Sequence, residues 1–127
     1  MLLEERMRTI SEAICAMHGA TCQFSYTHEF APTVNLQQCV DVAVTAAINV
    51  VGAEKVDGNV AQMMISEDFG AFLQKIPGCF IFLGNGDSSD AQGNTPLHNA
   101  CYDFNDEILL TGAEYFAEVV RTRLPQE

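Results

Sequence analysis

The 127-residue chain carries 17 acidic and six basic side chains, a formal charge of −11, and 48% of its residues are hydrophobic. This balance argues against partners with phosphate backbones and against an anionic membrane surface. No apolar run approaches the roughly 20 residues that a membrane helix needs. Acidic residues also stand near the N-terminus, where a signal peptide carries basic ones. We therefore expect a folded, soluble, cytoplasmic protein.

Five cysteines are spread along the chain, and no two of them form a CxxC pair. An odd count without such pairs argues against a disulfide framework and against a paired zinc knuckle. Cys15 and Cys39 fall within apolar helical patterns, where buried free thiols are common. The cysteine pattern therefore fits a reducing compartment.

The first 31 residues predict one helix and one strand. Apolar residues recur at three- and four-residue steps from Leu3 to Met17, which predicts an amphipathic helix that ends at Gly19. Residues 20–30 alternate between apolar and polar, which is typical of a half-buried strand. One helix and one strand cannot enclose a core, so we expect this pair to pack against something else.

A break at Pro32 opens the second part of the chain. Asn35 is predicted to cap a helix with a wide apolar face that ends at Gly52. Ser66 is predicted to cap a short helix that runs to about Ile76. This part therefore begins with two helices of unequal length.

Residues 79–83 form a continuous apolar run bounded by glycine, which is typical of a central strand buried on both faces. Residues 84–103 follow as a long polar loop of the kind that is often functional. Asn105 is predicted to cap a last helix, with an inward face formed by Leu109, Ala113, Phe116 and Val120. The fold class expected is α/β overall and α+β within this chain, with a central sheet strand flanked by helices.

Two groups of residues are candidates for chemistry. His98 follows the predicted central strand, and an imidazole at such a sheet edge suits a metal ligand or a general base. The simpler interpretation is a surface loop histidine. Glu67 and Asp68 could bind a cation or orient a histidine, although acids in a first helical turn are also favoured by the helix dipole alone. His98 with Cys101 and Cys79 gives only three zinc ligands, one fewer than a structural site usually needs.

Taken in order, the segments resemble the C-terminal part of the M20 peptidase family, in its amidohydrolase branch of aminoacylases and hippurate-hydrolase-like enzymes. The resemblance covers almost the whole chain. It is carried by an ordered series of short motifs: His18-Gly19-Ala20, Ala31-Pro32-Thr33-Val34-Asn35, Ile65-Ser66-Glu67-Asp68-Phe69, Ile76-Pro77-Gly78, Phe80-Ile81-Phe82-Leu83-Gly84, Pro96-Leu97-His98-Asn99 and Tyr102-Asp103-Phe104. Each motif is short, and the specificity lies in their order.

The resemblance implies a two-domain metallohydrolase in which a ferredoxin-like lid is inserted into an α/β catalytic domain. Residues 1–31 then correspond to the last helix and strand of the lid, which is a dimerisation-type domain, and residues 32–127 to the C-terminal part of the catalytic domain. Two divalent metals, zinc or manganese, activate water in that family. His98 matches its C-terminal metal ligand, while Glu67 and Asp68 match a segment near the site. The remaining ligands and the general base belong to segments that this sequence does not contain.

Two functions remain open at this point. The first is the C-terminal fragment of an amidohydrolase that hydrolyses N-acyl amino acids or similar small substrates, is inactive alone, binds no metal tightly and belongs to a homo-oligomer. The second is a non-enzymatic interaction module that self-associates or binds a partner completing the fold. A small independent metal-binding protein that uses His98 and the cysteines is a third interpretation. Whether the chain itself is an enzyme is not decided by its sequence.

Overall fold

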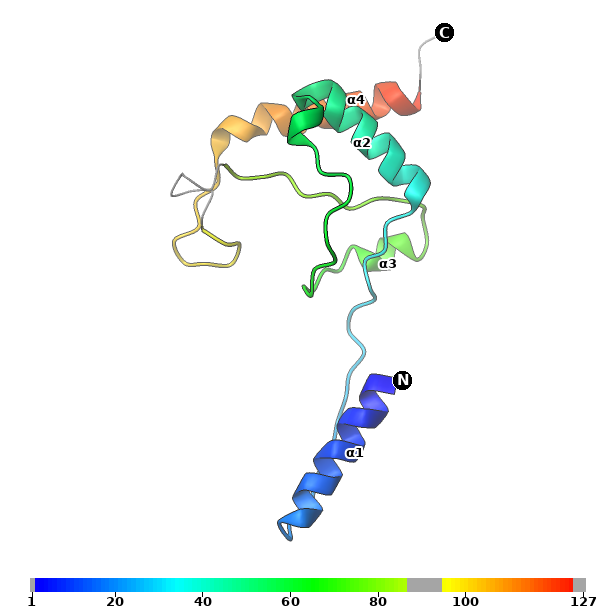
Figure 1. Ribbon diagram of the computed structural model, residues 1–127, viewed down its shortest axis with the longest axis vertical. Coiled ribbons are helices and arrows are strands. Elements are labelled where there is room, and N and C mark those ends of the chain that lie inside the picture. Colours follow the sequence, from blue (N-terminus) through cyan, green and yellow to red (C-terminus); the bar gives the residue numbers. More distant parts are fainter. Residues whose placement is uncertain (1, 87–94, 125–127) are drawn as a thin grey trace. The chain divides into compact units, whose positions relative to one another are not determined.

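The computed structural model describes residues 2–86 and 95–124 (Figure 1). The chain divides into two compact units, Met1–Ala31 and Pro32–Glu127. The described residues form four α-helices and two short 3-10 turns: α1 (Leu2–Met17), α2 (Gln37–Val51), η1 (Ala53–Lys55), α3 (Gly70–Leu73), η2 (Asp106–Ile108) and α4 (Leu109–Arg123). Part of the predicted loop 84–103 lies outside the described residues.

The predicted α/β fold class is wrong, and so is its α+β form within the chain. No residue in the described part of the chain lies in a β-strand, although residues 20–30 and 79–83 were both expected to form one. A strand exists only through a ladder of backbone hydrogen bonds to a neighbouring strand. Alternation and apolar runs are local properties of the sequence, whereas the ladder partner is distant. Both segments are extended without such a partner, so the described residues form neither the predicted central sheet strand nor the predicted strand of the first unit.

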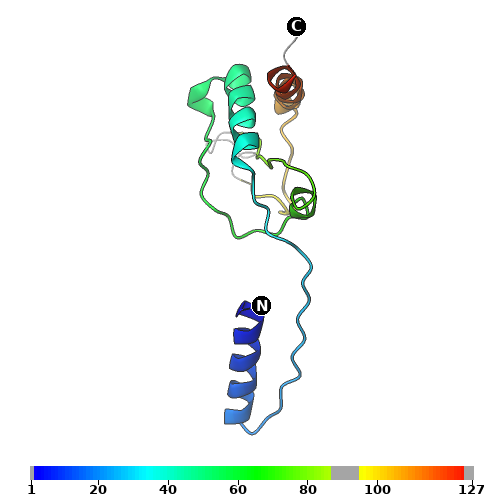
Figure 2. The ribbon, with the colours of Figure 1, turned by 90° about the vertical axis from the view of Figure 1, so that its right-hand side faces the viewer.

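Helix α1 occupies the residues that periodicity predicted, and the chain reverses after it at Gly19, whose φ is 68°. Its predicted apolar stripe, however, faces solvent: Leu3 is 74% exposed and Met17 is 78% exposed. The returning segment runs back beside α1 (Figure 2). Glu4 and Cys15 of α1 are half-buried, and α1 contains no fully buried residue.

Helix α2 begins one residue later than a cap at Asn35 would place it. Leu36 holds the N-cap position and no side chain caps the helix, whereas its end at Gly52 (φ 88°) is as predicted. The wide apolar face includes Ala43 and Ala46, which are 7% and 0% exposed. These two alanines are the buried apolar residues of the described chain, so the core of this unit lies along α2.

Helix α4 packs beside α2, as both ribbon views show (Figures 1 and 2). Asn49 of α2 donates its side-chain amide to Glu118 Oε1 of α4 at 2.9 Å, and Arg121 donates to Glu118 Oε2 at 3.2 Å. Tyr115 is half-buried on the same face of α4. The helix therefore meets α2 through a face that contains both polar and aromatic side chains.

The inward face predicted for α4 is wrong. Leu109 is 59% exposed, Phe116 is 70% exposed and Val120 is 57% exposed, and Ala113 is exposed as well. Helix α4 carries apolar residues on two sides, and periodicity cannot say which side meets a neighbour. Asn105 caps the η2 turn that precedes α4, because its side chain accepts a hydrogen bond from the Glu107 backbone N–H at 3.0 Å. Helix α4 itself begins at Leu109, with Ile108 at its N-cap and no side-chain cap.

Two asparagine side chains fasten the extended segments to the rest of their unit. Asn35 donates to the carbonyl of Phe80 at 2.9 Å and accepts from the Phe80 N–H at 2.7 Å. Asn85 donates to the carbonyl of Asp103 at 2.9 Å and accepts from the Asn105 N–H at 2.8 Å. Each amide bonds both a backbone donor and a backbone acceptor, and we call these two arrangements the asparagine clasps.

Helix α3 is one turn long, because the helix predicted from Ser66 to about Ile76 forms only at Gly70–Leu73. Aromatic contacts attach it to the extended segment that follows: the rings of Phe69 and Phe80 lie 5.4 Å apart between centroids, and those of Phe80 and Phe82 lie 5.2 Å apart. Phe69 also contacts Phe72 at 5.6 Å. The segment 79–83 is thus held by the Phe69 ring at the start of α3 and by an asparagine clasp.

Candidate functional site

His98 occupies an unusual backbone conformation within a tight turn. The Asn99 N–H donates to the carbonyl of Pro96 at 3.2 Å, which makes His98 the third residue of a β-turn. Its φ is 68°, and it is the non-glycine residue with positive φ in the described chain. That position of a type II turn usually takes glycine, because side chains are strained there by about 1–2 kcal/mol. The imidazole is exposed.

The residues after His98 continue the turn through the Asn99 side chain. The side-chain Oδ1 of Asn99 accepts from the Cys101 N–H at 2.8 Å, and the backbone carbonyl of Asn99 accepts from the Tyr102 N–H at 3.0 Å. Residues that hold a sparsely populated backbone conformation need such surrounding bonds to persist. The segment Pro96-Leu97-His98-Asn99 therefore presents the imidazole on a turn that hydrogen bonds hold in place.

Glu67 and Asp68 differ in their surroundings although they are neighbours. Glu67 is half-buried, and its Oε1 accepts from the Phe69 N–H at 3.1 Å. Asp68 is exposed, and its carbonyl accepts from the Ala71 N–H as α3 begins. Ser66 was expected to cap this helix, but the N-cap position of α3 is held by Phe69. The Glu67 carboxylate thus supports its own turn.

The structure does not gather the candidate residues into a metal centre. Among the described residues, no three His, Cys, Asp or Glu side chains lie close enough together to hold one ion. No hydrogen bond or ion pair joins His98 to Glu67 or Asp68 in that part of the chain. The described residues therefore do not fit a two-metal centre by themselves, and the trio of His98, Cys101 and Cys79 does not form a site either.

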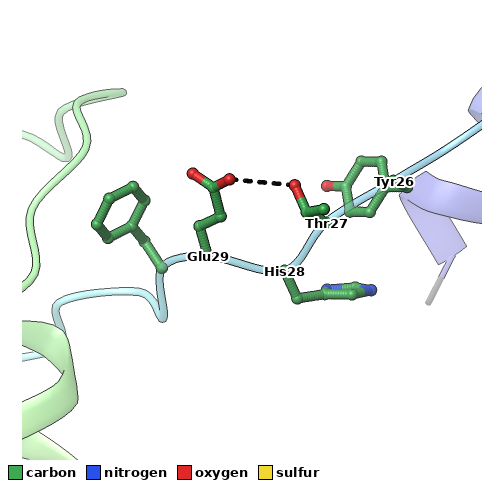
Figure 3. A pocket seen from close by; sticks show the side chains of 5 residues that line it. Tyr26, Thr27, His28 and Glu29 are labelled. Atoms are coloured by element: carbon green, nitrogen blue, oxygen red, sulfur yellow. Dashed lines mark hydrogen bonds between the residues drawn. The ribbon is translucent and has the colours of Figure 1, made fainter.

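A shallow hollow lies along the extended segment Tyr26–Phe30, and Figure 3 shows its side chains. Thr27 and Glu29 point to one side, where the Thr27 hydroxyl donates to Glu29 Oε1 at 3.2 Å, and His28 points to the other side. All of the lining residues come from one stretch of chain. The hollow is therefore a groove of an extended peptide and not a binding pocket built from several elements.

Three groups on or beside helices α2 and α4 have shifted pKa values: Cys79, Tyr115 and Glu118. Partial burial, and next to it the Cys39 thiol, raise the pKa of the Cys79 thiol, and partial burial and Cys79 likewise raise the pKa of the Tyr115 hydroxyl. Hydrogen bonds from Asn49 and then Arg121 lower the pKa of Glu118. Of these groups, Asn49 and Glu118 join the two helices by a hydrogen bond, and none of the groups lies beside His98 in the sequence.

The sequence did not predict the hydrogen bonds that Asn35 and Asn85 make. Asn35 was expected to cap a helix and instead clasps Phe80, and Asn85 was given no role. The signal available in the sequence was a pair of asparagines placed just before a helix and just after an apolar run. Thr33 was also missed: its hydroxyl is buried without a hydrogen-bond partner in the described structure.

No helix of the described residues is long and apolar enough to cross a membrane. No solved structure was found to match the chain. Comparison with families of known proteins gave one clear result, because the model of peptidase family M20/M25/M40 matches residues 5–122.

Curated relatives agree with that match. A hippurate hydrolase of Campylobacter jejuni is 29% identical over 93% of this chain and 29% of its own length, and thermostable carboxypeptidase 2 of Saccharolobus solfataricus is 33% identical over 87% of this chain and 27% of its own. An N-acetylcysteine deacetylase of Bacillus subtilis is 28% identical over 91% of this chain and 28% of its own length. The chain spans less than a third of the length of each of these relatives. With the family model matched over nearly all of its residues, the chain belongs to peptidase family M20/M25/M40.

Proposed function

We propose that the chain is the C-terminal portion of a metal-dependent amidohydrolase that cleaves the amide bond of N-acyl amino acids or similar small substrates. The observation that carries this proposal is the family match across residues 5–122. Two of the relatives, the hippurate hydrolase and the N-acetylcysteine deacetylase, are named for small amide substrates. The M20 family is generally metal-dependent, and zinc or manganese is the ion we expect.

Within that enzyme we assign residues 1–31 to the lid domain and residues 32–127 to the catalytic domain. The division of the chain into units at Ala31 and Pro32 supports this assignment. We also propose a cytoplasmic location, because the described cysteines are free, and a homo-oligomeric assembly through the lid.

His98 is the residue we assign to the metal site. Its turn presents an exposed imidazole from a left-handed backbone conformation that glycine would adopt at lower cost. A strained residue that persists in a bonded turn is a candidate for a functional role. The chain supplies this one ligand, whereas Glu67 and Asp68 belong to the neighbourhood of the site, and the other ligands lie outside this sequence.

The same reasoning implies that the chain is inactive alone, because one imidazole cannot hold two metals. The test is metal analysis of the purified chain together with hydrolysis assays on hippurate and N-acetylcysteine, with zinc or manganese added. A full-length family member serves as the positive control. Turnover by the chain alone, with bound metal, would contradict the proposal of an inactive portion.

Replacing His98 by alanine tests its role. We expect His98→Ala to leave the helix content of this chain unchanged by far-UV circular dichroism, because the imidazole is exposed. The corresponding change in a full-length relative is expected to lower metal affinity by about 100-fold or more and to abolish hydrolysis.

The control for this substitution is His18→Ala, which removes another exposed histidine. It is expected to leave the helix content of the chain unaltered. A large loss of helix content in His98→Ala alone would identify the histidine as a structural residue of its turn, and would count against the metal assignment.

An interaction module is the second candidate function, and a specific observation favours it. The apolar stripe of α1 and the outer side of α4 are both exposed, with Ile10 at 57% and Phe116 at 70%. Contiguous exposed apolar surface usually marks an interface. Static light scattering over a range of concentrations tests this function, and a compact monomer at high concentration would contradict it.

A further inference from the structure

The end of α1 brings two cysteines to the same place. The Ala20 N–H donates to the carbonyl of Cys15 at 2.8 Å, and Gly19 takes the left-handed conformation that reverses the chain. Ala20 is therefore fixed at the level of Cys15 on the helix. Cys22 follows two residues later in the extended segment, and a hydrogen bond joins its side chain to that of Cys15.

Two further contacts fix how the returning segment runs along α1. The guanidinium of Arg8 lies 4.7 Å from the centre of the Phe24 ring, and Nε2 of His28 lies 3.0 Å from Oε2 of Glu4. Phe24 and His28 thus meet helix positions that lie progressively closer to the N-terminus. The returning segment accordingly runs back along α1 (Figure 2). Cys15 and Cys22 are both half-buried, which places them on the facing sides of the two segments.

We propose that Cys15 and Cys22 are a reversible disulfide pair that locks the returning segment onto α1. The co-reactant is a small-molecule disulfide, RSSR. The thiolate of one cysteine attacks one sulfur of RSSR, forms a mixed disulfide and releases one RSH. The thiolate of the other cysteine then attacks the protein sulfur of that mixed disulfide and releases the second RSH. Two protein thiols are oxidised and one RSSR is reduced, and both protons end on the two RSH molecules.

The surroundings of Cys15 and Cys22 set the rate of thiol–disulfide exchange between them. Partial burial raises the pKa of the Cys22 thiol, and the charge of Cys15 and a hydrogen bond with its side chain raise it further. The attacking species is the thiolate, so exchange is expected to be slower near neutral pH and faster in alkaline solution. Since α1 contains no buried residue, a covalent tie would add a constraint that packing does not provide.

The experiment uses the full chain and oxidised glutathione as the probe. The reduced protein is incubated with the probe at concentrations below the roughly millimolar effective concentration of two groups joined by a short chain. Free thiols are then alkylated, and the disulfides are mapped by peptide mass spectrometry. We expect a Cys15–Cys22 bridge as the main product, formed faster as the pH rises and reversed by dithiothreitol.

Variants separate this pair from the other thiols. Cys15→Ser and Cys22→Ser should each abolish the bridge and leave a mixed disulfide with glutathione on the remaining cysteine. The matched control Cys101→Ser, which removes an exposed thiol elsewhere, should leave the bridge intact. A bridge between Cys39 and Cys79, crosslinks between molecules, or mixed disulfides alone in the unmodified chain would each overturn the proposal. The mapping on the unmodified chain stands even if a variant folds poorly.

Discussion

Single side chains hold much of the second unit together, and Asn35 is the clearest case. Its amide satisfies both backbone groups of Phe80. A net hydrogen bond contributes about 0.5–1.5 kcal/mol, so we expect Asn35→Ala to lower the free energy of unfolding by about 1–3 kcal/mol. A urea titration followed by far-UV circular dichroism measures this loss.

Asn59→Ala is the control for the Asn35 substitution, because it removes an exposed asparagine side chain that lies outside the clasps. A similar change in the urea midpoint for both variants would show that the clasp with Phe80 contributes nothing specific.

Glu118 gives a prediction about pH. The Asn49 amide and then the Arg121 guanidinium hold its pKa below the ordinary value of 4.5. A carboxyl with a lowered folded-state pKa stabilises the fold above its unfolded pKa, and that stabilisation is lost as pH falls through the folded value. We therefore expect Asn49→Ala to raise the pKa of Glu118, as a carbon-13 NMR titration of the glutamate carboxyls would measure. An unchanged titration midpoint would rule out the hydrogen bond between the two helices.

Whole elements were predictable from the sequence where the signal is local. The span of α1, the ends at Gly19 and Gly52, and the Asn105 cap all follow from residues within a few positions of each other. The conformation of the extended segments 20–30 and 79–83 was not predictable in this way, because strand pairing depends on a distant partner that periodicity does not reveal. The two-sided apolar pattern of α4 likewise left its inward face undetermined.

The candidate site shows the same division between local and distant information. The sequence singled out His98 from its motif, yet its left-handed φ of 68° had no signal, because that backbone position is usually taken by glycine. The different surroundings of Glu67 and Asp68 also depend on how the turn before α3 closes. Motif reasoning therefore located the residues and not their conformations.

At the scale of the helix, Gly112 of α4 is a site for stabilisation. A Cβ added there would lie 3.5 Å from Cδ2 of Leu83, which is an ordinary contact. Alanine is a better helix former than glycine by about 0.5–1 kcal/mol. We expect Gly112→Ala to raise the urea midpoint, since the helix gains propensity without a clash.

Gly78→Ala is the contrasting variant at a second glycine of the same unit. Its added Cβ would come within 2.8 Å of Cδ2 of Leu73, so the leucine or the backbone would have to shift. We expect this change to lower the urea midpoint, by about 1 kcal/mol in free energy of unfolding. If both glycine variants moved the midpoint in the same direction, the packing described around Leu83 and Leu73 would be incorrect.

For the chain as a whole, the small core sets the expected stability. The buried apolar side chains of the described residues are Ala43 and Ala46, while large side chains such as Phe116 and Met64 are exposed. Burial of apolar surface is the dominant favourable term in folding. We therefore expect the isolated chain to unfold with a free energy below about 5 kcal/mol and to bind a hydrophobic fluorescent dye. A sharp two-state urea transition without dye binding would contradict this.

The asparagine clasps also decide where backbone amides are protected from exchange with solvent deuterium. A β-ladder would shield alternate amides along residues 79–83, whereas a clasp shields the single N–H that it bonds, here that of Phe80. The second clasp shields the N–H of Asn105 in the same way. Slow exchange in these segments should therefore occur at isolated points, set against the continuous protection of α2 and α4.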